Sequence, residues 1–333
     1  MSERTFKILA VDGGGIRGIY PAKYLAELEK EVEEPLCRYF DLIAGTSTGG
    51  IIAIALGLEI PAARILELYK SKGAEIFSQL FCLGMLLRPK YRNDALLAAL
   101  KEILGEKLLG DSKVPLCIPA VDLSTGQPKV YKTGHDPRLT EDWQLPAWKV
   151  AAATAAAPLY FPAFSVHEHD AKVDGGLWAN NPALVGVVEA LSLGYKLEEI
   201  MVLSLGTGKV PFYMAPEVAK RAGLFQWFRS VILRLRLRGA CQGQSLGDLL
   251  LVVQSEAINN QVGVLHRWAG LKEYYRINSD LPPGRFGLDA VQTALELEEF
   301  ARQKAQETKA PVKDAFLKER ASEGSRLLDR RKR

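Results

Sequence analysis

The five residues Gly45-Thr46-Ser47-Thr48-Gly49, here called the serine turn, constrain this 333-residue chain more than any other stretch. They follow an apolar run, 39–44, that predicts a buried strand, and precede another, 50–56, that predicts a buried helix. A strand, then G-x-S-x-G, then a helix is the context of a nucleophile elbow, which presents its serine at a sharp, strained turn. Small neighbours, here Gly45 and Gly49, let the strand and the helix approach. The alternative interpretation is the N-cap of an ordinary buried helix.

A second glycine-rich stretch, here called the glycine loop, lies between a predicted strand at 6–11 and a predicted helix over 20–32. Its residues are Gly13, Gly14, Gly15, Ile16, Arg17 and Gly18. Consecutive glycines leave backbone N–H groups that can point at one place, and such a loop stabilises either a phosphate or the oxyanion of an acyl transfer. The spacing also matches the dinucleotide fingerprint, but the next predicted strand ends in the serine turn and not in the acidic residue which that fingerprint needs.

A serine hydroxyl is a weak nucleophile and needs a base. Histidine is the usual base, and the chain has four: His135, His167, His169 and His266. None of them lies in a sequence context that suggests a catalytic base. Asp174 ends an apolar run and is followed by Gly175 and Gly176, which places its carboxylate at a strand end with little bulk beside it. A carboxylate can act as the base when it is desolvated and hydrogen-bonded to the serine. We therefore predict a Ser47–Asp174 dyad with the glycine loop as its oxyanion hole.

Composition and charge describe an ordinary globular chain, 48% hydrophobic and 25% charged, with a net charge of +4. The chain has four cysteines, Cys37, Cys82, Cys117 and Cys241. They form no CxxC pair, so we expect neither a zinc site nor a disulfide framework. The N-terminus lacks a signal-peptide pattern, and the apolar runs are shorter than the roughly 20 residues that cross a bilayer. We expect a cytoplasmic protein that binds no metal and is at most peripheral to a membrane.

The last third of the chain differs in character. Between residues 218 and 247 there are six basic and no acidic residues, with aromatic and aliphatic residues on one side of a helical wheel. This segment predicts a membrane-surface helix, a solvated cap helix or an anion pocket. Its candidate membrane or anion contacts are Arg221, Trp227, Arg229, Arg234, Arg236 and Arg238. Helices are predicted at 246–259 and 288–303, with a strand at 274–277 between them. The apolar run 77–87 is interpreted as core or as a flap.

Three motifs, in this order, resemble the patatin-like phospholipases: residues 12–18, 45–49 and 174–176. Agreement extends to 153–158, 160–162, 178–182 and 204–208, so the resemblance covers roughly residues 6–210, with Ala155 departing from a serine that many members carry. The resemblance implies an α/β fold, a three-layer α/β/α sandwich with a mostly parallel central sheet. It also implies that Ser47 is the nucleophile and Asp174 the base, and that the glycine loop, fixed in part by Arg17, is the oxyanion hole. Members hydrolyse acyl esters of phospholipids and other glycerolipids without calcium.

We expect a single domain over 1–333, divided into a motif-bearing core (6–210), a divergent helical cap, regulatory or membrane-contact region (211–310) and a charged tail (311–333). The chain is also similar to bacterial patatin-like effectors of antiphage defence, which cyclic dinucleotides activate to degrade the cell's own membrane. The implied partners are membrane phospholipids and a cyclic dinucleotide, but no nucleic acid polymer. The alternatives are a storage-type or non-specific esterase relative with incidental activity, and a nucleotide-binding module that uses the glycine loop.

Overall fold

The computed structural model describes residues 5–78, 89–212, 216–220 and 246–321. Its strands form one sheet in the order β4-β3-β2-β1-β6-β7, and β5 pairs with β3 off this path. The neighbours from β3 to β7 pair in parallel, whereas β4 and β5 run antiparallel to β3. The strands are β1 (Phe6–Val11), β2 (Leu42–Gly45), β3 (Leu116–Asp122), β4 (Gln127–Lys132), β5 (Lys172–Asp174), β6 (Ile200–Leu205) and β7 (Glu273–Ile277).

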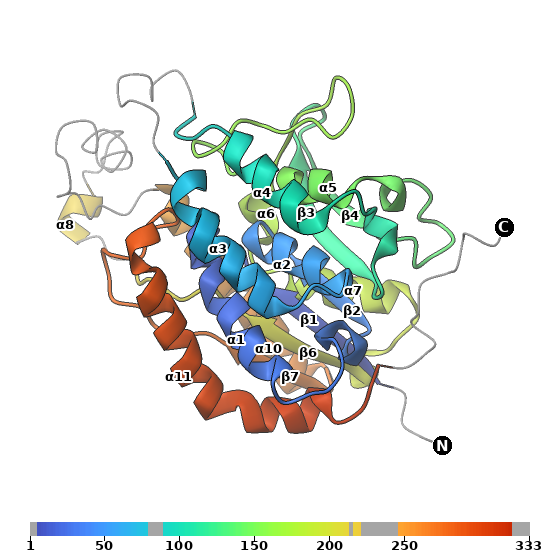
Figure 1. Ribbon diagram of the computed structural model, residues 1–333. Coiled ribbons are helices and arrows are strands. Elements are labelled where there is room, and N and C mark those ends of the chain that lie inside the picture. The colour runs from blue at the N-terminus through green and yellow to red at the C-terminus, as the bar shows by residue number, and fades with distance from the viewer. Residues whose placement is uncertain (1–4, 79–88, 213–215, 221–245, 322–333) are drawn as a thin grey trace.

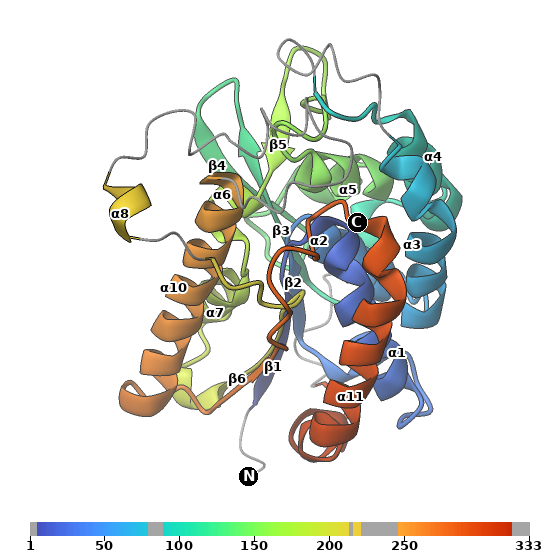
Figure 2. The same cartoon turned by 90° about the vertical axis from the view of Figure 1, so that its left-hand side faces the viewer.

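Helices cover both faces of this sheet (Figures 1 and 2). In Figure 2, α7 and α10 lie on one side of the sheet, and α1, α3 and α11 lie on the other. The longer helices are α1 (Ile19–Glu29), α2 (Thr48–Gly57), α3 (Ala62–Ile76), α4 (Asp94–Leu104), α5 (Ala147–Ala155), α7 (Ala183–Ser192), α10 (Leu246–Trp268) and α11 (Ala294–Val312), and the short ones are α6 (Gly176–Ala179) and α8 (Pro216–Ala219).

The central strand β1 divides its side chains between two hydrophobic cores. Leu9 and Val11 belong to the larger core, which also holds the buried residues of α1, α2 and α3. Phe6, Ile8 and Ala10 belong to the smaller core, with residues of α7 and α10. Successive side chains of a strand point to opposite faces, so a strand buried on both faces reads as a continuous apolar run. The predicted three-layer sandwich with a mostly parallel sheet is confirmed.

The different lengths of β2 and β3 bring β5 next to the serine turn. Along one edge, β3 pairs with β4 from Cys117 to Asp122. On its other edge it pairs with β2 only as far as Ala44↔Cys117, and farther along it pairs with β5 at Ala120↔Asp174. Because β5 takes the place that β2 leaves, Asp174 lies just beyond the carboxyl end of β2, where the chain turns into Ser47.

The described part of the expected cap region, 211–310, completes the sandwich instead of standing above it. Strand β7 extends the sheet beside β6, and α11 packs along α1 on the larger core (Figure 1). The helix predicted at 288–303 begins at Ala294 and continues to Val312. Two residues at the start of the predicted range are bonded to other segments and are not helical. The Leu288 carbonyl accepts the Ile16 N–H, and the Asp289 carboxylate accepts the Tyr91 hydroxyl.

The expected charged tail, 311–333, begins as packed structure. A π-helical turn, Lys313–Leu317, follows α11 directly, and Phe316 is fully buried between the rings of Phe40 and Tyr275. Lys7 also donates to the carbonyls of Phe316 and Glu319. Apolar residues within this charged stretch therefore anchor it as far as residue 321, and only the remainder lies outside the described residues.

The candidate contacts of the basic segment also lie outside the described residues: Arg221, Trp227, Arg229, Arg234, Arg236 and Arg238. The same holds for residues 79–88 of the apolar run that was interpreted as core or flap. Among the helices that the structure describes, none has both the length and the apolar character needed to cross a bilayer.

Candidate active site

The serine turn has the strained geometry of a nucleophile elbow. Ser47 connects β2 to α2 with φ 56° and ψ −124°, a conformation that costs a residue with a side chain about 1–3 kcal/mol. Its flanking glycines lie where the strand and the helix cross. A Cβ atom at Gly45 would lie 2.1 Å from the Gly49 carbonyl oxygen, and one at Gly49 would lie 2.1 Å from the Val11 carbonyl oxygen. The crossing therefore admits only glycine at both positions.

Ser47 and Asp174, 127 residues apart, share a direct hydrogen bond. The Ser47 hydroxyl donates to Asp174 Oδ2 at 2.5 Å, and Asp174 Oδ1 accepts the Gly176 N–H at 2.7 Å. Both residues are buried, with exposed fractions of 8% and 6%. Burial raises the pKa of Asp174 from 3.8 to about 6, against the lowering effect of these two hydrogen bonds. At neutral pH the carboxylate is therefore ionised, and it is a stronger base than an exposed aspartate.

Thr154, on α5, holds the serine turn from the side. Its hydroxyl accepts the Ser47 N–H at 3.0 Å and donates to the Pro119 carbonyl at 2.5 Å, so it connects the turn to β3. A Cβ at Gly175 would lie 2.3 Å from the same Pro119 oxygen, which explains the glycine after Asp174. Sequence reasoning did not single out Thr154, although it stands alone as a hydroxyl in an alanine-rich helix.

The glycine loop lies against the serine turn, and most of its amides have partners. A Cβ at Gly13 would lie 3.2 Å from Ser47 Cβ. The Gly13 N–H donates to the Asn180 carbonyl at 2.9 Å, and the Ile16 N–H donates to the Leu288 carbonyl at 2.8 Å. Within the described chain, the N–H groups of Gly14 and Gly15 donate to no other residue. The oxyanion role of the whole loop, Gly13 to Gly18, stays a prediction.

Side chains from two other segments hold the loop. The Gly13 carbonyl accepts from the Thr207 hydroxyl at 3.0 Å and from the Asn180 amide at 3.4 Å. Asn180 in turn donates to the Ser255 hydroxyl of α10 at 2.8 Å. Arg17 donates to the Gly208 carbonyl at 3.3 Å, which ties the far side of the loop to the turn after β6.

A buried ion pair lies directly before the loop. Arg276 of β7 donates to both carboxylate oxygens of Asp12, at 2.9 and 2.6 Å, and to the Ser204 hydroxyl at 2.8 Å. Burial raises the pKa of Asp12, and the charge and hydrogen bonds of Arg276 oppose that rise. Sequence reasoning missed this pair. The available signal was an arginine between Tyr275 and Ile277 in the predicted strand at 274–277.

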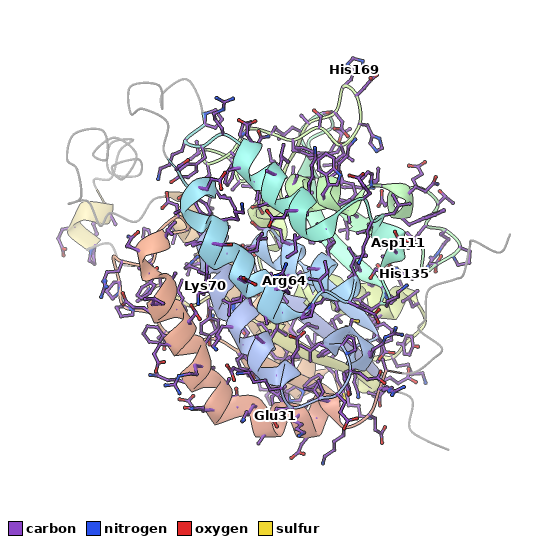
Figure 3. The ribbon with its side chains drawn as sticks, in the orientation of Figure 1. Glu31, Arg64, Lys70, Asp111, His135 and His169 are labelled. Atoms are coloured by element: carbon purple, nitrogen blue, oxygen red, sulfur yellow. The ribbon has the colours of Figure 1, made fainter. Side chains whose placement is uncertain are left out.

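No imidazole takes the place of the carboxylate. His135 bonds Glu189 and Thr133, His266 bonds the Leu271 carbonyl, and His167 and His169 are exposed. Figure 3 shows His169 at the outer tip of a loop, and His135 on another side of the molecule. In the described part of the chain, no three His, Cys, Asp or Glu side chains form a group that could hold a metal ion.

Residues 9–187 match the family model of the patatin-like phospholipases. The chain is 34% identical over 292 residues to a cGAMP-activated phospholipase of Pseudomonas aeruginosa, a match that covers 84% of this chain and 80% of the relative. It is 32% identical over 269 residues to a protein of the same name from Escherichia coli (75% and 72% covered). It is 36% identical over 256 residues to patatin-like protein 4 of Arabidopsis thaliana (64% and 63% covered).

Proposed function

The chain belongs to the patatin-like phospholipase family and is a lipid hydrolase, and we propose that it cleaves fatty-acyl esters of membrane phospholipids and other glycerolipids through an acyl-enzyme on Ser47. The observation that carries this proposal is the 2.5 Å hydrogen bond from the Ser47 hydroxyl to Asp174. It joins a strained serine to a buried carboxylate of raised pKa, and no histidine bonds either residue among those described.

Acylation begins when Ser47 Oγ attacks the ester carbonyl carbon and its proton passes to Asp174 Oδ2. The carbonyl π electrons move to the oxygen and form a tetrahedral oxyanion. When this intermediate collapses, the carbon–oxygen bond to the glycerol breaks, and the leaving alkoxide takes the proton from Asp174. The products are a lysophospholipid and an acyl-enzyme. The pKa of about 6 suits Asp174 to both steps, since the carboxylate must accept a proton and then release it near neutral pH.

Deacylation follows the same path with water as the nucleophile. Asp174 accepts a proton from water as the water oxygen attacks the acyl carbon, and the collapse returns the proton to Ser47 and releases the fatty acid. We assign the oxyanion in both steps to the N–H groups of Gly14 and Gly15, together with the positive end of α2. Loss of one such donor typically costs about 100- to 1000-fold in rate.

Ser47→Ala and Asp174→Ala test this assignment. Each variant should lose hydrolysis of phosphatidylglycerol and phosphatidylethanolamine vesicles, measured as released fatty acid, while its circular dichroism spectrum stays that of the wild type. Full hydrolysis by either folded variant would exclude the dyad. The rival nucleotide-binding module predicts dinucleotide binding that Gly15→Asp abolishes and Ser47→Ala leaves intact. The close approach of the loop to Ser47 argues against that rival.

We also propose that a cyclic dinucleotide activates the enzyme. Two of the relatives reported above are named cGAMP-activated phospholipases, and the basic segment of residues 218–238 would suit an anionic ligand. Vesicle hydrolysis should rise when cGAMP is added, and a panel of other cyclic dinucleotides should show selectivity. Equal rates with and without every nucleotide would remove this proposal and leave the hydrolase assignment standing.

The cellular setting that we propose is antiphage defence by a cytoplasmic enzyme that touches the membrane only while it is active. Cells that express the wild type with its nucleotide synthase should restrict phage plaques, and cells that express Ser47→Ala should not. Co-sedimentation with anionic vesicles, with and without nucleotide, measures the membrane contact. Equal plaque counts in both strains would exclude the defensive role.

A further inference from the structure

We infer that Arg276, on β7, is a positioning residue for the glycine loop and acts on it through the carboxylate of Asp12. The inference rests on the proposed function, because it concerns the placement of the oxyanion donors. Residue 276 lies far outside the span 9–187 that matches the family model.

Hydrogen bonds hold both the backbone and the side chain of Asp12, and Arg276 supplies those to the side chain. Asp12 is the residue directly before Gly13, and its own N–H donates to the Leu205 carbonyl at 2.9 Å. The Arg276 guanidinium holds its two carboxylate oxygens with separate hydrogen bonds, and such a bidentate pair sets a plane as well as a distance. The side chains are 14% and 4% exposed, so water competes little for these bonds.

The order of the strands β1, β6 and β7 in the sheet brings Arg276 to Asp12. Arg276 is in register with Ser204 on β6, whose hydroxyl accepts the third hydrogen bond. Strand β6 pairs with β1 on its other edge, so the guanidinium reaches across β6 to the end of β1. A planar fork anchored to two strands of a central sheet has little freedom, and it gives Asp12 a rigid support.

The glycine loop needs such supports because glycine has the widest backbone freedom of any residue. Among the described residues, the N–H groups of Gly14 and Gly15 meet no acceptor. The far end of the loop is held where Ile16 N–H meets the Leu288 carbonyl. The near end is held at Gly13 by Asn180 and Thr207, and at Asp12 by the Leu205 carbonyl and by Arg276, which is the only one of these supports that fixes the Asp12 carboxylate at both oxygens. A displacement of about 1 Å at reacting groups can cost about 100-fold in rate, so release of this end should be measurable as slower catalysis.

Two variants separate positioning from stability. Arg276→Lys keeps the positive charge beside Asp12 but cannot make both parallel hydrogen bonds, and Arg276→Gln removes the charge. The matched control is Glu189→Gln, which disturbs another buried ion pair, to Lys132 and His135, away from the loop. If Arg276→Gln does not fold, the double variant Asp12→Asn/Arg276→Gln replaces it, because it buries no unpaired charge.

The measurement is kcat for a short-chain p-nitrophenyl ester per active site, with sites counted by complete reaction with a fluorophosphonate. Both Arg276 variants should titrate to full occupancy, and their kcat per site should fall about 10- to 100-fold with KM little changed. Glu189→Gln should keep the wild-type kcat per site even if it unfolds at a lower temperature. A kcat per site within about twofold of the wild type in both Arg276 variants would overturn the inference.

Ser47→Ala in the same assay keeps this inference separate from the proposed function. Hydrolysis by Ser47→Ala would remove the nucleophile assignment itself. An inactive Ser47→Ala together with undiminished Arg276 variants would remove only the positioning role. A loss of titratable sites without a change in kcat per site would show a folding role, and this outcome too overturns the inference.

Discussion

Asp174→Asn should make the protein more stable while it abolishes hydrolysis. The Asp174 carboxylate is 6% exposed, and burial raises its pKa from 3.8 to about 6. Above this pH, folding must therefore place a negative charge where water cannot solvate it well. Asparagine has nearly the same shape and no charge, and its carbonyl can still accept the Gly176 N–H. Active sites commonly carry such a stability cost.

The magnitude follows from proton linkage. A pKa difference of about 2 units corresponds to about 3 kcal/mol of lost stability once both states are ionised, near pH 8. Between pH 3.8 and about 6 the folded protein keeps a proton that the unfolded chain has released, so the stability of the wild type falls as the pH rises through this window. Below pH 3.8 both states hold the proton, and the cost disappears.

Urea unfolding of the wild type and of Asp174→Asn between pH 4.5 and 8 measures this cost. The stability advantage of the variant should grow by about 2 kcal/mol across this range. Asp136→Asn is the matched control, because Arg138 lowers the pKa of Asp136 and the charged form is the favoured one there; this variant should be less stable than the wild type by an amount that does not change between pH 4.5 and 8. An advantage that does not change with pH, or a variant less stable than the wild type at pH 8, would refute the reasoning.

Three further predictions concern the site. The value of kcat/KM should fall about tenfold per pH unit below about pH 6, as Asp174 becomes protonated in the free enzyme; a profile flat to pH 5 would contradict this. Thr154→Val should leave the Ser47 N–H without its acceptor and cost about 1–3 kcal/mol, measured by urea unfolding, whereas Thr154→Ser should preserve most of that stability. Gly49→Ala should prevent cooperative folding, because its Cβ would meet the Val11 carbonyl; a wild-type thermal transition would show that the crossing can relax.

Several elements of the site could be predicted because neighbouring residues determine their geometry. The serine turn is recognisable since a strand that passes directly into a helix needs glycine at Gly45 and Gly49, and the structure places backbone oxygens 2.1 Å from where their Cβ atoms would lie. Asp174 could be identified for a similar reason, from a strand end followed by two glycines. Strand β7 could also be located from its apolar pattern, as residues 274–277 within Glu273–Ile277.

Other features depend on which strands become neighbours, and no local pattern carries that information. The helix predicted from residue 288 begins at Ala294, because Leu288 and Asp289 bond the glycine loop and Tyr91 instead. The Gly13 N–H, which the glycine pattern left open to a ligand, donates instead to the carbonyl of Asn180, far along the chain. The packing of Phe316, within a stretch expected to be a charged tail, likewise depends on rings from two distant segments.

Local patterns were thus sufficient to locate a serine at a strand-to-helix turn, an aspartate at a strand end and a loop of consecutive glycines, because glycine spacing and apolar periodicity act over a few residues. Their catalytic roles stay a proposal. Tertiary structure alone decided how these parts are held. The pairing of β5 beyond the end of β2 brings Asp174 to Ser47, and the order β1-β6-β7 brings Arg276 to Asp12. The physical reason is that a buried charge or hydroxyl costs free energy unless it has a hydrogen-bond partner, and the packing of the whole sheet determines which distant residue is close enough to be that partner.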